Sequence, residues 1–354
     1  MKIGIDARND GTGVGRYTFS LVRELARLDG GNEYTLFLNA RRHASYEPPG
    51  PNFRTVEADI PWFGVREQVQ LPRLIAREGL DLVHFPHLTV PLLTATPFVV
   101  TVHDLNYLDA AATDRRAVLR AGYRLELLKA RRARRLIAVS EHTRGEVVRR
   151  LRVEPDRVAV TYEAADAPTV EPDPATLQRH KIDAPFFLYV GSAYPYKNLA
   201  RLIEAFAEVE GAYHLVLAGD QEDFGAALRE RATERVVFTG PVSEAELAAL
   251  YAGALAYVFV SLSEGFGLPG LEAMAACVPV VAARAGSLPE VYGDAAHYCD
   301  PHDVNSIASA LRDVARDEEL RLRLVARGRV CAAEFSWTRT AEQTLAVYRK
   351  ALLH

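Results

Sequence analysis

The chain has 354 residues, of which 49% are hydrophobic and 25% charged, a composition typical of a soluble globular protein with room for two domains. The formal net charge of −4 gives no general attraction to nucleic acids. The longest apolar runs, such as TPFVVTV, are too short to cross a membrane, and the start, MKIGIDARND, has no apolar signal region. We therefore expect a cytoplasmic protein.

Short β-rich segments alternate with helical patterns through the first half of the chain. Strands are expected at 2–6, 33–39, 82–86, 98–104 and 135–140, and helices at 15–28, 115–133 and 141–151. This alternation predicts a parallel sheet whose strands are connected by helical crossovers.

The first strand is followed by a glycine-rich segment, GIDARNDGTGVG. Gly11, Gly13 and Gly15 precede the first helix, which makes this loop a candidate for approach to a phosphate. The spacing is G-x-G-x-G, whereas a dinucleotide site requires G-x-G-x-x-G, and the second strand ends in Asn39 where such a site has an acidic residue. A nicotinamide site is therefore not expected.

Histidines follow two of the expected strands. His103, next to Asp104, ends the strand at 98–104, where it can donate a hydrogen bond to a substrate hydroxyl or serve a structural role. His84 and His87 are separated by Pro86 and have no evident cysteine or carboxylate partner, so no metal site is predicted. The three cysteines are widely spaced, without a CxxC pair, which also argues against a disulfide framework or a zinc site.

The helix expected at 115–133 opens a strongly basic segment, Arg115 to Arg135, in which Glu126 is the sole acidic residue. One interpretation is a basic amphipathic helix that lies on an anionic membrane surface. The other is a solvated outer helix packed on its own sheet. Both interpretations remain open at this point.

A segment rich in proline, aspartate and alanine, residues 165–186, has no periodicity and is typical of a linker. Strands are then expected at 186–191, 213–219, 235–240, 255–261 and 278–283, with a last helix over 336–353. The repeated α/β pattern predicts two nucleotide-binding-type domains that face one cleft. Their expected bounds are 1–167, joined by a C-terminal helix at 337–354, and 168–336.

The segment SEGFGLPGLEAM, residues 263–274, follows an expected strand. Gly265 and Gly267 allow close approach of the backbone to a ligand, and Pro269 suits the first position of a helix whose N-terminus attracts phosphate. Glu264 in the loop and Glu272 in the first helical turn are then candidates for binding a sugar and a ribose. The alternative is that Glu272 complements the helix dipole and the glycines form a turn.

The segment YVGSAYPYKNLARL, residues 189–202, opens the second half. Lys197 stands between the strand and a helix that starts near Asn198, at the edge of the sheet where ligands bind. A lysine there can neutralise a diphosphate leaving group; the alternative is an ordinary surface lysine.

Together these segments resemble the retaining glycosyltransferases of family 4, and the resemblance covers nearly the whole chain. SEGFGLPGLEAM matches their E-x7-E motif, and VVFTGPVSEAELAALYAG, GSLPEVYGDAAHYCDP and VVTVHDL are also similar. The resemblance implies the GT-B fold: an α/β protein with two Rossmann-like domains facing a central cleft and a C-terminal helix that crosses back to the first domain.

The family's activity is implied as well. Its members move a hexose from a nucleotide-diphosphate sugar to a hydroxyl acceptor in glycan or glycolipid synthesis, with retention of configuration and without an obligatory metal or cofactor. The PYKNL motif resembles branches that often use GDP-mannose, which is therefore the favoured donor. A carbohydrate or a lipid-linked acceptor is expected; the lipid-linked one fits peripheral contact of 115–135 with the inner face of the membrane.

Individual roles follow from the matching positions. The resemblance places Glu264, His103 and Lys197 in the catalytic set and makes Glu272 the ribose ligand. The other implied donor-binding residues are Gly13, Gly15, Phe238, Thr239, Gly240, Gly265, Phe266, Gly267 and Leu268.

One departure bears on rate or donor choice. Many family members carry an arginine beside the phosphate, where this chain has Ser192 or Tyr196, and Arg201 and Arg16 are the candidate replacements. Two rival functions remain open: a nucleotide-sugar epimerase of the same fold, and a non-catalytic nucleotide-sugar-binding protein.

Overall fold

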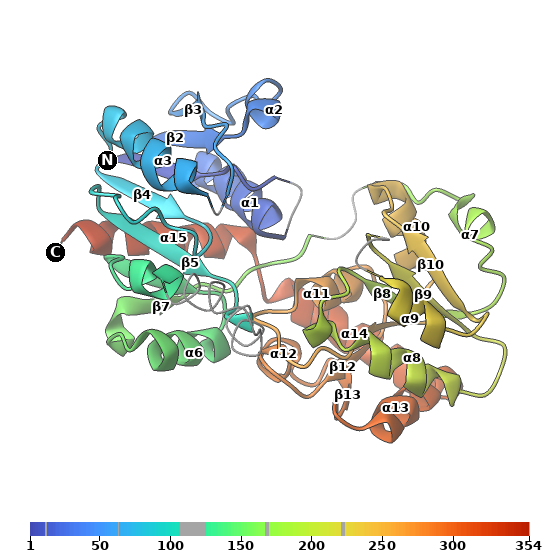
Figure 1. Ribbon diagram of the computed structural model, residues 1–354. Helices are drawn as coiled ribbons and strands as arrows, with labels where there is room; N and C mark the ends of the chain where they lie inside the picture. Colours follow the sequence, from blue (N-terminus) through green and yellow to red (C-terminus); the bar gives the residue numbers. More distant parts are fainter. Residues whose placement is uncertain (11–12, 63, 107–124, 167–169, 221–223, 354) are drawn as a thin grey trace. The chain divides into compact units, whose positions relative to one another are not determined.

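Two units of similar construction make up the computed structural model, which describes residues 1–10, 13–62, 64–106, 125–166, 170–220 and 224–353 (Figure 1). Unit 1 consists of Met1–Glu163 and Ser336–His354, and unit 2 of Ala164–Phe335. None of the helices within these described ranges is long and apolar enough to span a membrane.

The described part of unit 1 contains a seven-stranded parallel sheet. In sheet order its strands are β3 (Phe53–Glu57), β2 (Glu33–Leu38), β1 (Lys2–Asp6), β4 (Leu82–Phe85), β5 (Phe98–Val102), β6 (Arg135–Ala138) and β7 (Val158–Val160). The central strands β4 and β5 are buried along their whole length. Burial on both faces is why these segments are nearly continuous apolar runs in the sequence.

Helices cover the sheet of unit 1. They are α1 (Gly13–Leu28), α2 (Ala40–His43), α3 (Val65–Arg77), α6 (Glu141–Leu151), the short 3-10 turn η1 (Pro155–Arg157) and the C-terminal α15 (Trp337–Leu352). Two of them start at serine N-caps: the hydroxyl of Ser140 accepts from the Thr143 amide before α6, and that of Ser336 from the Arg339 amide before α15.

Unit 2 repeats the pattern with a six-stranded parallel sheet. Its strands, in sheet order, are β10 (Val236–Gly240), β9 (His214–Ala218), β8 (Phe186–Val190), β11 (Ala256–Phe259), β12 (Val280–Ala283) and β13 (Ala296–Cys299). Counted within each unit, both sheets have the strand order 3-2-1-4-5-6, the Rossmann arrangement, and unit 1 adds a seventh strand. The predicted pair of Rossmann-like domains is confirmed.

The helices of unit 2 complete its layers. They are α7 (Thr176–Arg179), η2 (Pro195–Lys197), α8 (Leu199–Ala207), α9 (Ala226–Arg231), α10 (Glu244–Gly253), α11 (Leu268–Ala275), α12 (Leu288–Tyr292), α13 (Val304–Arg316) and α14 (Glu318–Ala333). Among them, α8 packs against α13, and α11 packs against α14.

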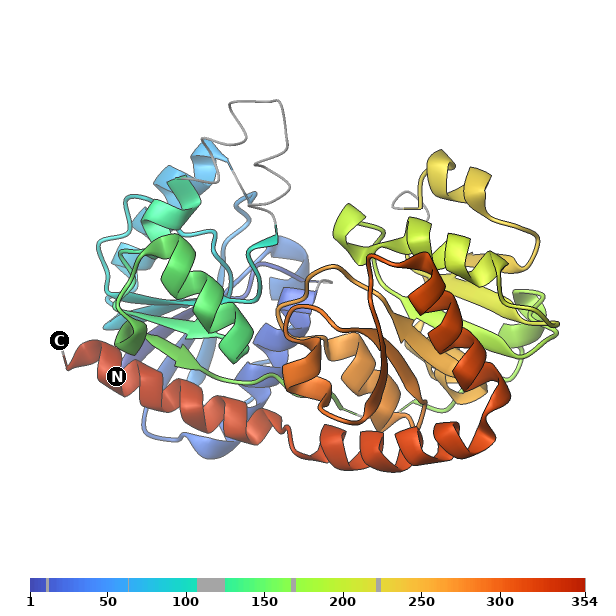
Figure 2. The same cartoon turned by 90° about the horizontal axis from the view of Figure 1, so that it is seen from below.

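The C-terminal helix α15 belongs to unit 1, as predicted, although it follows unit 2 in the chain. It packs against α1 and against β5 and β6, and Figure 2 shows it in red along unit 1. A buried chain of hydrogen bonds fastens it: Tyr348 Oη to His84 Nδ1 at 2.7 Å, His84 Nε2 to Thr101 Oγ1 at 2.8 Å, and Thr101 Oγ1 to Tyr17 Oη at 3.1 Å. All four side chains are fully buried, so each polar atom needs its partner.

Only part of the basic segment Arg115–Arg135 lies within the described residues, because 107–124 fall outside them. In the described part, Lys129 is buried and pairs with Glu126 at 2.5 Å, while Arg132 donates to the Thr94 carbonyl at 3.1 Å. Arg135, in β6, donates to the Asp156 carbonyl at 2.7 Å. The basic side chains Lys129, Arg132 and Arg135 therefore stabilise unit 1 itself, which supports the interpretation of a segment packed on its own sheet.

The protonation state of His84 predicts how the stability of unit 1 depends on pH. Burial, together with a smaller effect of the nearby charge of His103, lowers the pKa of His84 to about 3. The unfolded chain binds a proton here below about pH 6.5 while the folded protein does not, so stability falls as the pH falls through that value. From about pH 7 to about pH 5 we expect a loss of about 2 kcal/mol from His84.

His84→Gln should remove that part of the pH dependence. Urea unfolding followed by tryptophan fluorescence reports on unit 1, since both tryptophans, Trp62 and Trp337, lie in it. The comparison is the difference in unfolding free energy between the two pH values for each protein. An equal difference in wild type and variant would show that His84 is not held neutral.

Candidate active site

An ion pair joins two of the predicted site residues in unit 2. Lys197 ends η2, shortly after β8, and Glu264 lies in the loop between β11 and α11. The Lys197 ammonium donates to Glu264 Oε1 at 2.7 Å, and the two side chains are only 13% and 9% exposed. Since each nearly buried charge needs the other, this contact fixes both groups at the carboxyl edge of the sheet.

Aromatic rings lie beside Lys197. One of them is Tyr196, at a position where the resemblance leads us to expect an arginine. The Lys197 ammonium lies 5.1 Å from the ring centre of Tyr196 and 5.2 Å from that of Phe259, within the range of cation–π attraction. The Ser192 carbonyl accepts from the Tyr189 hydroxyl at 2.6 Å, and Arg201 donates to Asn198 Oδ1 at 2.9 Å.

The loop before α11 depends on its glycines. Gly267 has φ +104°, a left-handed conformation, and its carbonyl accepts from the Tyr292 hydroxyl at 2.6 Å. A Cβ on Gly270 would lie 2.2 Å from the same hydroxyl oxygen. The neighbouring Phe266 side chain is buried and meets Phe335 edge to face, with ring centres 5.4 Å apart.

The expected positions of Pro269 and Glu272 in helix α11 were wrong by one turn or less. Helix α11 begins at Leu268, because Gly267 turns the chain into the helix one residue earlier than expected, so Pro269 is its second residue. Glu272 is the fifth residue, in the second turn, and has no place in capping the helix. Its carboxylate accepts from the Tyr251 hydroxyl at 3.5 Å.

The segment Phe238–Gly240 forms the end of β10, at the edge of the sheet. The Phe238 ring lies 4.6 Å from the Arg229 guanidinium and meets Phe224 with ring centres 5.6 Å apart. The Thr239 hydroxyl donates to the Gly240 carbonyl at 2.8 Å. Gly240 has φ +78°, which bends the chain at the carboxyl end of the strand.

In unit 1 the predicted glycines lie inside a helix, not in the loop before it. Gly13 and Gly15 are the first and third residues of α1, whereas Gly11 falls outside the described residues. A Cβ on Gly15 would lie 2.4 Å from the Asn9 carbonyl oxygen, so this position requires the close approach of two backbone segments. A Cβ on Gly13 would meet nothing within 4 Å.

His103 follows β5 and has partners on both ring nitrogens. Nδ1 lies 2.7 Å from Glu163 Oε1 and Nε2 lies 2.9 Å from the Pro86 carbonyl oxygen. The Tyr17 ring meets the imidazole edge to face at 4.8 Å. Burial lowers the pKa of His103, but the charge and hydrogen bond of Glu163 outweigh burial and raise this pKa above its ordinary value.

The remaining histidines of this edge are structural. His84 belongs to the buried chain that holds α15, and burial lowers the pKa of His87 to about 4. His87 lies against Trp62, with ring centres 5.9 Å apart. Among the described residues, no group of three or more histidines, cysteines, aspartates or glutamates is placed to hold a metal ion.

Comparison with known proteins decides the family. The model of "Glycosyltransferase Family 4" matches residues 11–167, and that of "Glycosyl transferases group 1" matches 175–330. An MMP alpha-(1->4)-mannosyltransferase of Mycolicibacterium hassiacum is 35% identical over 77% of this chain and 69% of its own length. The chain belongs to the family 4 glycosyltransferases.

Further similarities agree with that assignment. An O-antigen chain mannosyltransferase B of Escherichia coli is 35% identical over 61% of each chain. A crystal structure of Anabaena HepE in complex with UDP-glucose matches 99% of both chains with a TM-score of 0.79 at 17% identity. This structural likeness shows the shared fold, GT-B.

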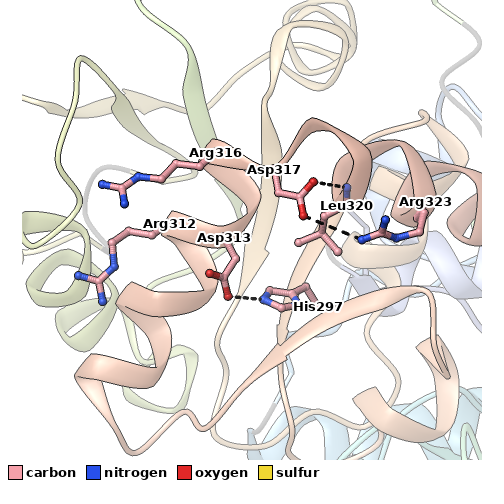
Figure 3. A pocket seen from close by; sticks show the side chains of 7 residues that line it. All are labelled: His297, Arg312, Asp313, Arg316, Asp317, Leu320 and Arg323. Atoms are coloured by element: carbon pink, nitrogen blue, oxygen red, sulfur yellow. Dashed lines mark hydrogen bonds and ion pairs between the residues drawn. The ribbon is translucent and has the colours of Figure 1, made fainter.

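A charged hollow in unit 2 contains none of the predicted site residues. Its volume is about 370 Å³, and Figure 3 shows its lining: His297, Arg312, Asp313, Arg316, Asp317, Leu320 and Arg323. His297 Nε2 lies 3.1 Å from Asp313, and Asp317 lies 4.0 Å from Arg323. Asp313 and Asp317 thus already have partners within the hollow, and none of the predicted site residues lines it.

Three residues that contact predicted site residues escaped the sequence analysis. Glu163, the partner of His103, lies just beyond β7, a strand that was not expected. Gly286 has φ +59°, and a Cβ there would lie 2.7 Å from the amide nitrogen of Glu264. Tyr292 contacts Gly267. The segment GSLPEVY, which the resemblance includes, contains Gly286 and Tyr292 and was the available signal.

Gly286→Ala tests whether the position of Glu264 depends on this close approach. The added methyl group would strain a left-handed backbone and collide with the main chain of Glu264, so we expect a loss of about 1–3 kcal/mol in the stability of unit 2. Gly225→Ala is the matched control, because its Cβ would meet nothing within 4 Å. Thermal unfolding followed by far-UV circular dichroism measures both, and equal behaviour of the two variants would contradict the prediction.

Proposed function

We propose that this family 4 glycosyltransferase is a retaining hexosyltransferase that uses a nucleoside-diphosphate sugar, with GDP-mannose as the first candidate. The observation that carries the proposal is the Lys197–Glu264 ion pair beside the glycine loop and the N-terminus of α11. Its relatives support mannose, since an O-antigen chain mannosyltransferase and an MMP mannosyltransferase are among them. The HepE complex with UDP-glucose supports a nucleotide sugar as donor.

Lys197 would change partner when the donor binds. In the structure its ammonium neutralises Glu264. A diphosphate carries more negative charge than one carboxylate and therefore competes for the lysine, while the N-terminus of α11 offers backbone dipoles to the same anion. Glu264 is then available to accept hydrogen bonds from the sugar, and Glu272 from the ribose hydroxyls.

The reaction that these groups support is a substitution at the anomeric carbon. The bond between C1 and the diphosphate oxygen breaks, and its electron pair stays on the diphosphate, where Lys197 and the helix dipole stabilise the charge. The acceptor hydroxyl attacks C1 on the face that the leaving group vacates, and its proton passes to the departing phosphate. No metal or covalent glutamate intermediate is required by this scheme.

Unit 1 is proposed to supply the acceptor side and His103. The acceptor we favour is a growing glycan or a lipid-linked sugar, by analogy with the O-antigen chain relative. The epimerase alternative requires no acceptor and would incorporate labelled solvent into the sugar. The alternative of a non-catalytic binding protein predicts that no nucleotide is released.

A nucleotide panel tests the donor site. We expect one series among UDP, GDP and ADP, with their hexose conjugates, to raise the melting temperature by mass action. Glu272→Ala should abolish the shift, whereas Glu244→Ala, which changes an exposed glutamate of α10, should keep it. A panel without any shift would argue against a nucleotide-sugar site, and an equal shift in Glu272→Ala would remove the ribose role.

Lys197→Met tests the role of the ammonium in leaving-group departure. The methionine keeps the length of the stem and removes the charge, so kcat should fall by about 100-fold or more. The matched control is Lys181→Met, which alters an exposed lysine of the same unit. Steady-state release of nucleotide measures kcat, and a variant with wild-type kcat would show that Lys197 does not stabilise the leaving group.

The same assay of the wild type with EDTA present tests metal independence.

A further inference from the structure

The pair formed by His103 and Glu163 connects the ends of two strands of unit 1. His103 follows β5, and Glu163 lies three residues beyond the end of β7. Glu163 is 3% exposed, and its Oε1 lies 2.7 Å from Nδ1 of the imidazole. The mechanism above assigns a role to His103 and none to Glu163.

The chemistry of the two acceptors restricts the protonation of the ring. A backbone carbonyl can only accept, so the 2.9 Å contact of Nε2 with Pro86 requires a proton on Nε2. The contact of Nδ1 with Glu163 requires a proton between them, either on the ring or on the carboxyl group. A proton on the ring gives an imidazolium and a carboxylate, and a proton on Glu163 gives a neutral pair.

The groups around the ring favour the imidazolium. The Tyr17 ring of α1 meets the His103 ring edge to face. The Thr143 hydroxyl of α6 donates to the main-chain carbonyl of His103 at 3.3 Å. Burial lowers the pKa values of His84 in β4 and of His87 after it, so neither neighbouring ring is positively charged near neutral pH and neither opposes a charge on His103. Burial opposes that charge, but Glu163, Pro86 and Asp104 all favour it and together raise the pKa of His103.

We propose that Glu163 is a positioning residue of the transferase: it holds His103 as an imidazolium whose Nε2–H is directed at the Pro86 carbonyl, so that the ring acts toward substrate solely as a hydrogen-bond donor. The role in the reaction rests on the proposed function. A substrate oxygen that accepts from Nε2 takes the place of the Pro86 carbonyl. A hydroxyl, carboxylate or phosphate oxygen satisfies the ring, whereas a group that can only donate does not.

A purely structural role for Glu163 makes a different prediction. A glutamine has the same shape, and its amide can donate to a neutral Nδ1, so Glu163→Gln retains a hydrogen bond between the two strands. It cannot supply the negative charge that keeps both nitrogens protonated. Stability can therefore survive the substitution while the titration of His103 changes.

Nuclear magnetic resonance of the histidine-labelled full chain measures the ring directly. In the wild type we expect both ring nitrogens of His103 to be protonated at about pH 7, above the ordinary midpoint of histidine. In Glu163→Gln the titration should move to lower pH, and Nδ1 should lose its proton first. The matched control is Glu24→Gln, a buried glutamate of α1 that pairs with Arg23 and Arg27; it should titrate like the wild type.

Kinetics then connect the ring to the reaction. At about pH 8 we expect Glu163→Gln to lose about tenfold in kcat/KM, and the alkaline limb of its pH profile to move to lower pH. Glu24→Gln should keep the wild-type profile. A singly protonated ring in the wild type, or an unmoved titration in Glu163→Gln, would overturn the proposal, as would a displaced titration with an unchanged pH profile.

The two measurements keep this proposal distinguishable from the proposed function. Absence of transfer in the wild type with every nucleotide sugar would remove the proposed function and, with it, the role of Glu163 in the reaction. The spectra need no substrate, so they still decide whether Glu163 holds the ring protonated. If Glu163→Gln does not fold, the wild-type spectra still decide whether both ring nitrogens are protonated, and a singly protonated ring overturns the proposal.

Discussion

The site in unit 2 depends on a single ion pair placed where water is largely excluded. Lys197 and Glu264 pair their opposite charges at this depth, so the contact fixes the η2 turn after β8 against the loop after β11. The loop that carries Glu264 can approach Gly286 closely only because Gly286 has no side chain, since a Cβ there would collide with the main chain of Glu264. The Ser287 hydroxyl donates to the Glu264 carbonyl at 3.0 Å. In the proposed function, the same pair supplies the ammonium that a donor diphosphate attracts.

Unit 1 shows how two histidines of one sheet come to differ in protonation. His84 lies between the hydroxyls of Thr101 and Tyr348, which can donate or accept, so a neutral ring satisfies both. His103 lies between a carboxyl group and a carbonyl, and with Glu163 ionised both partners only accept, so the proposed arrangement has two ring protons. The His84 ring is fully buried and the His103 ring is largely buried, and the difference in protonation comes from their partners. The neutral histidine anchors α15, and the charged one lies at the edge of the sheet.

The sequence was sufficient for the class of fold because parallel sheets bury their central strands as apolar runs. It failed at the borders of the sheets, where β3, β7 and β13 lie. Strand β7 has three residues and β3 reads FRTVE, so neither forms an apolar run. Missing β7 also hid Glu163. The glycines of α1 were assigned to a loop because their small size suggested a ligand, whereas Gly15 accommodates the Asn9 carbonyl.

This chain lacks the arginine that many family members carry beside the phosphate, and the surroundings of Lys197 show what occupies that place. Tyr196 holds its ring against the Lys197 ammonium and stacks on Tyr194, with ring centres 5.9 Å apart. Arg201 is drawn to Asn198, whose amide is fixed by the carbonyls of Val260 and Pro301 at 3.1 and 2.7 Å. An ammonium between aromatic rings is less hydrated than one in water, so its attraction for a diphosphate is stronger. In the proposed donor site, one partly buried lysine between aromatic rings therefore stands where the resemblance leads us to expect a lysine and an arginine.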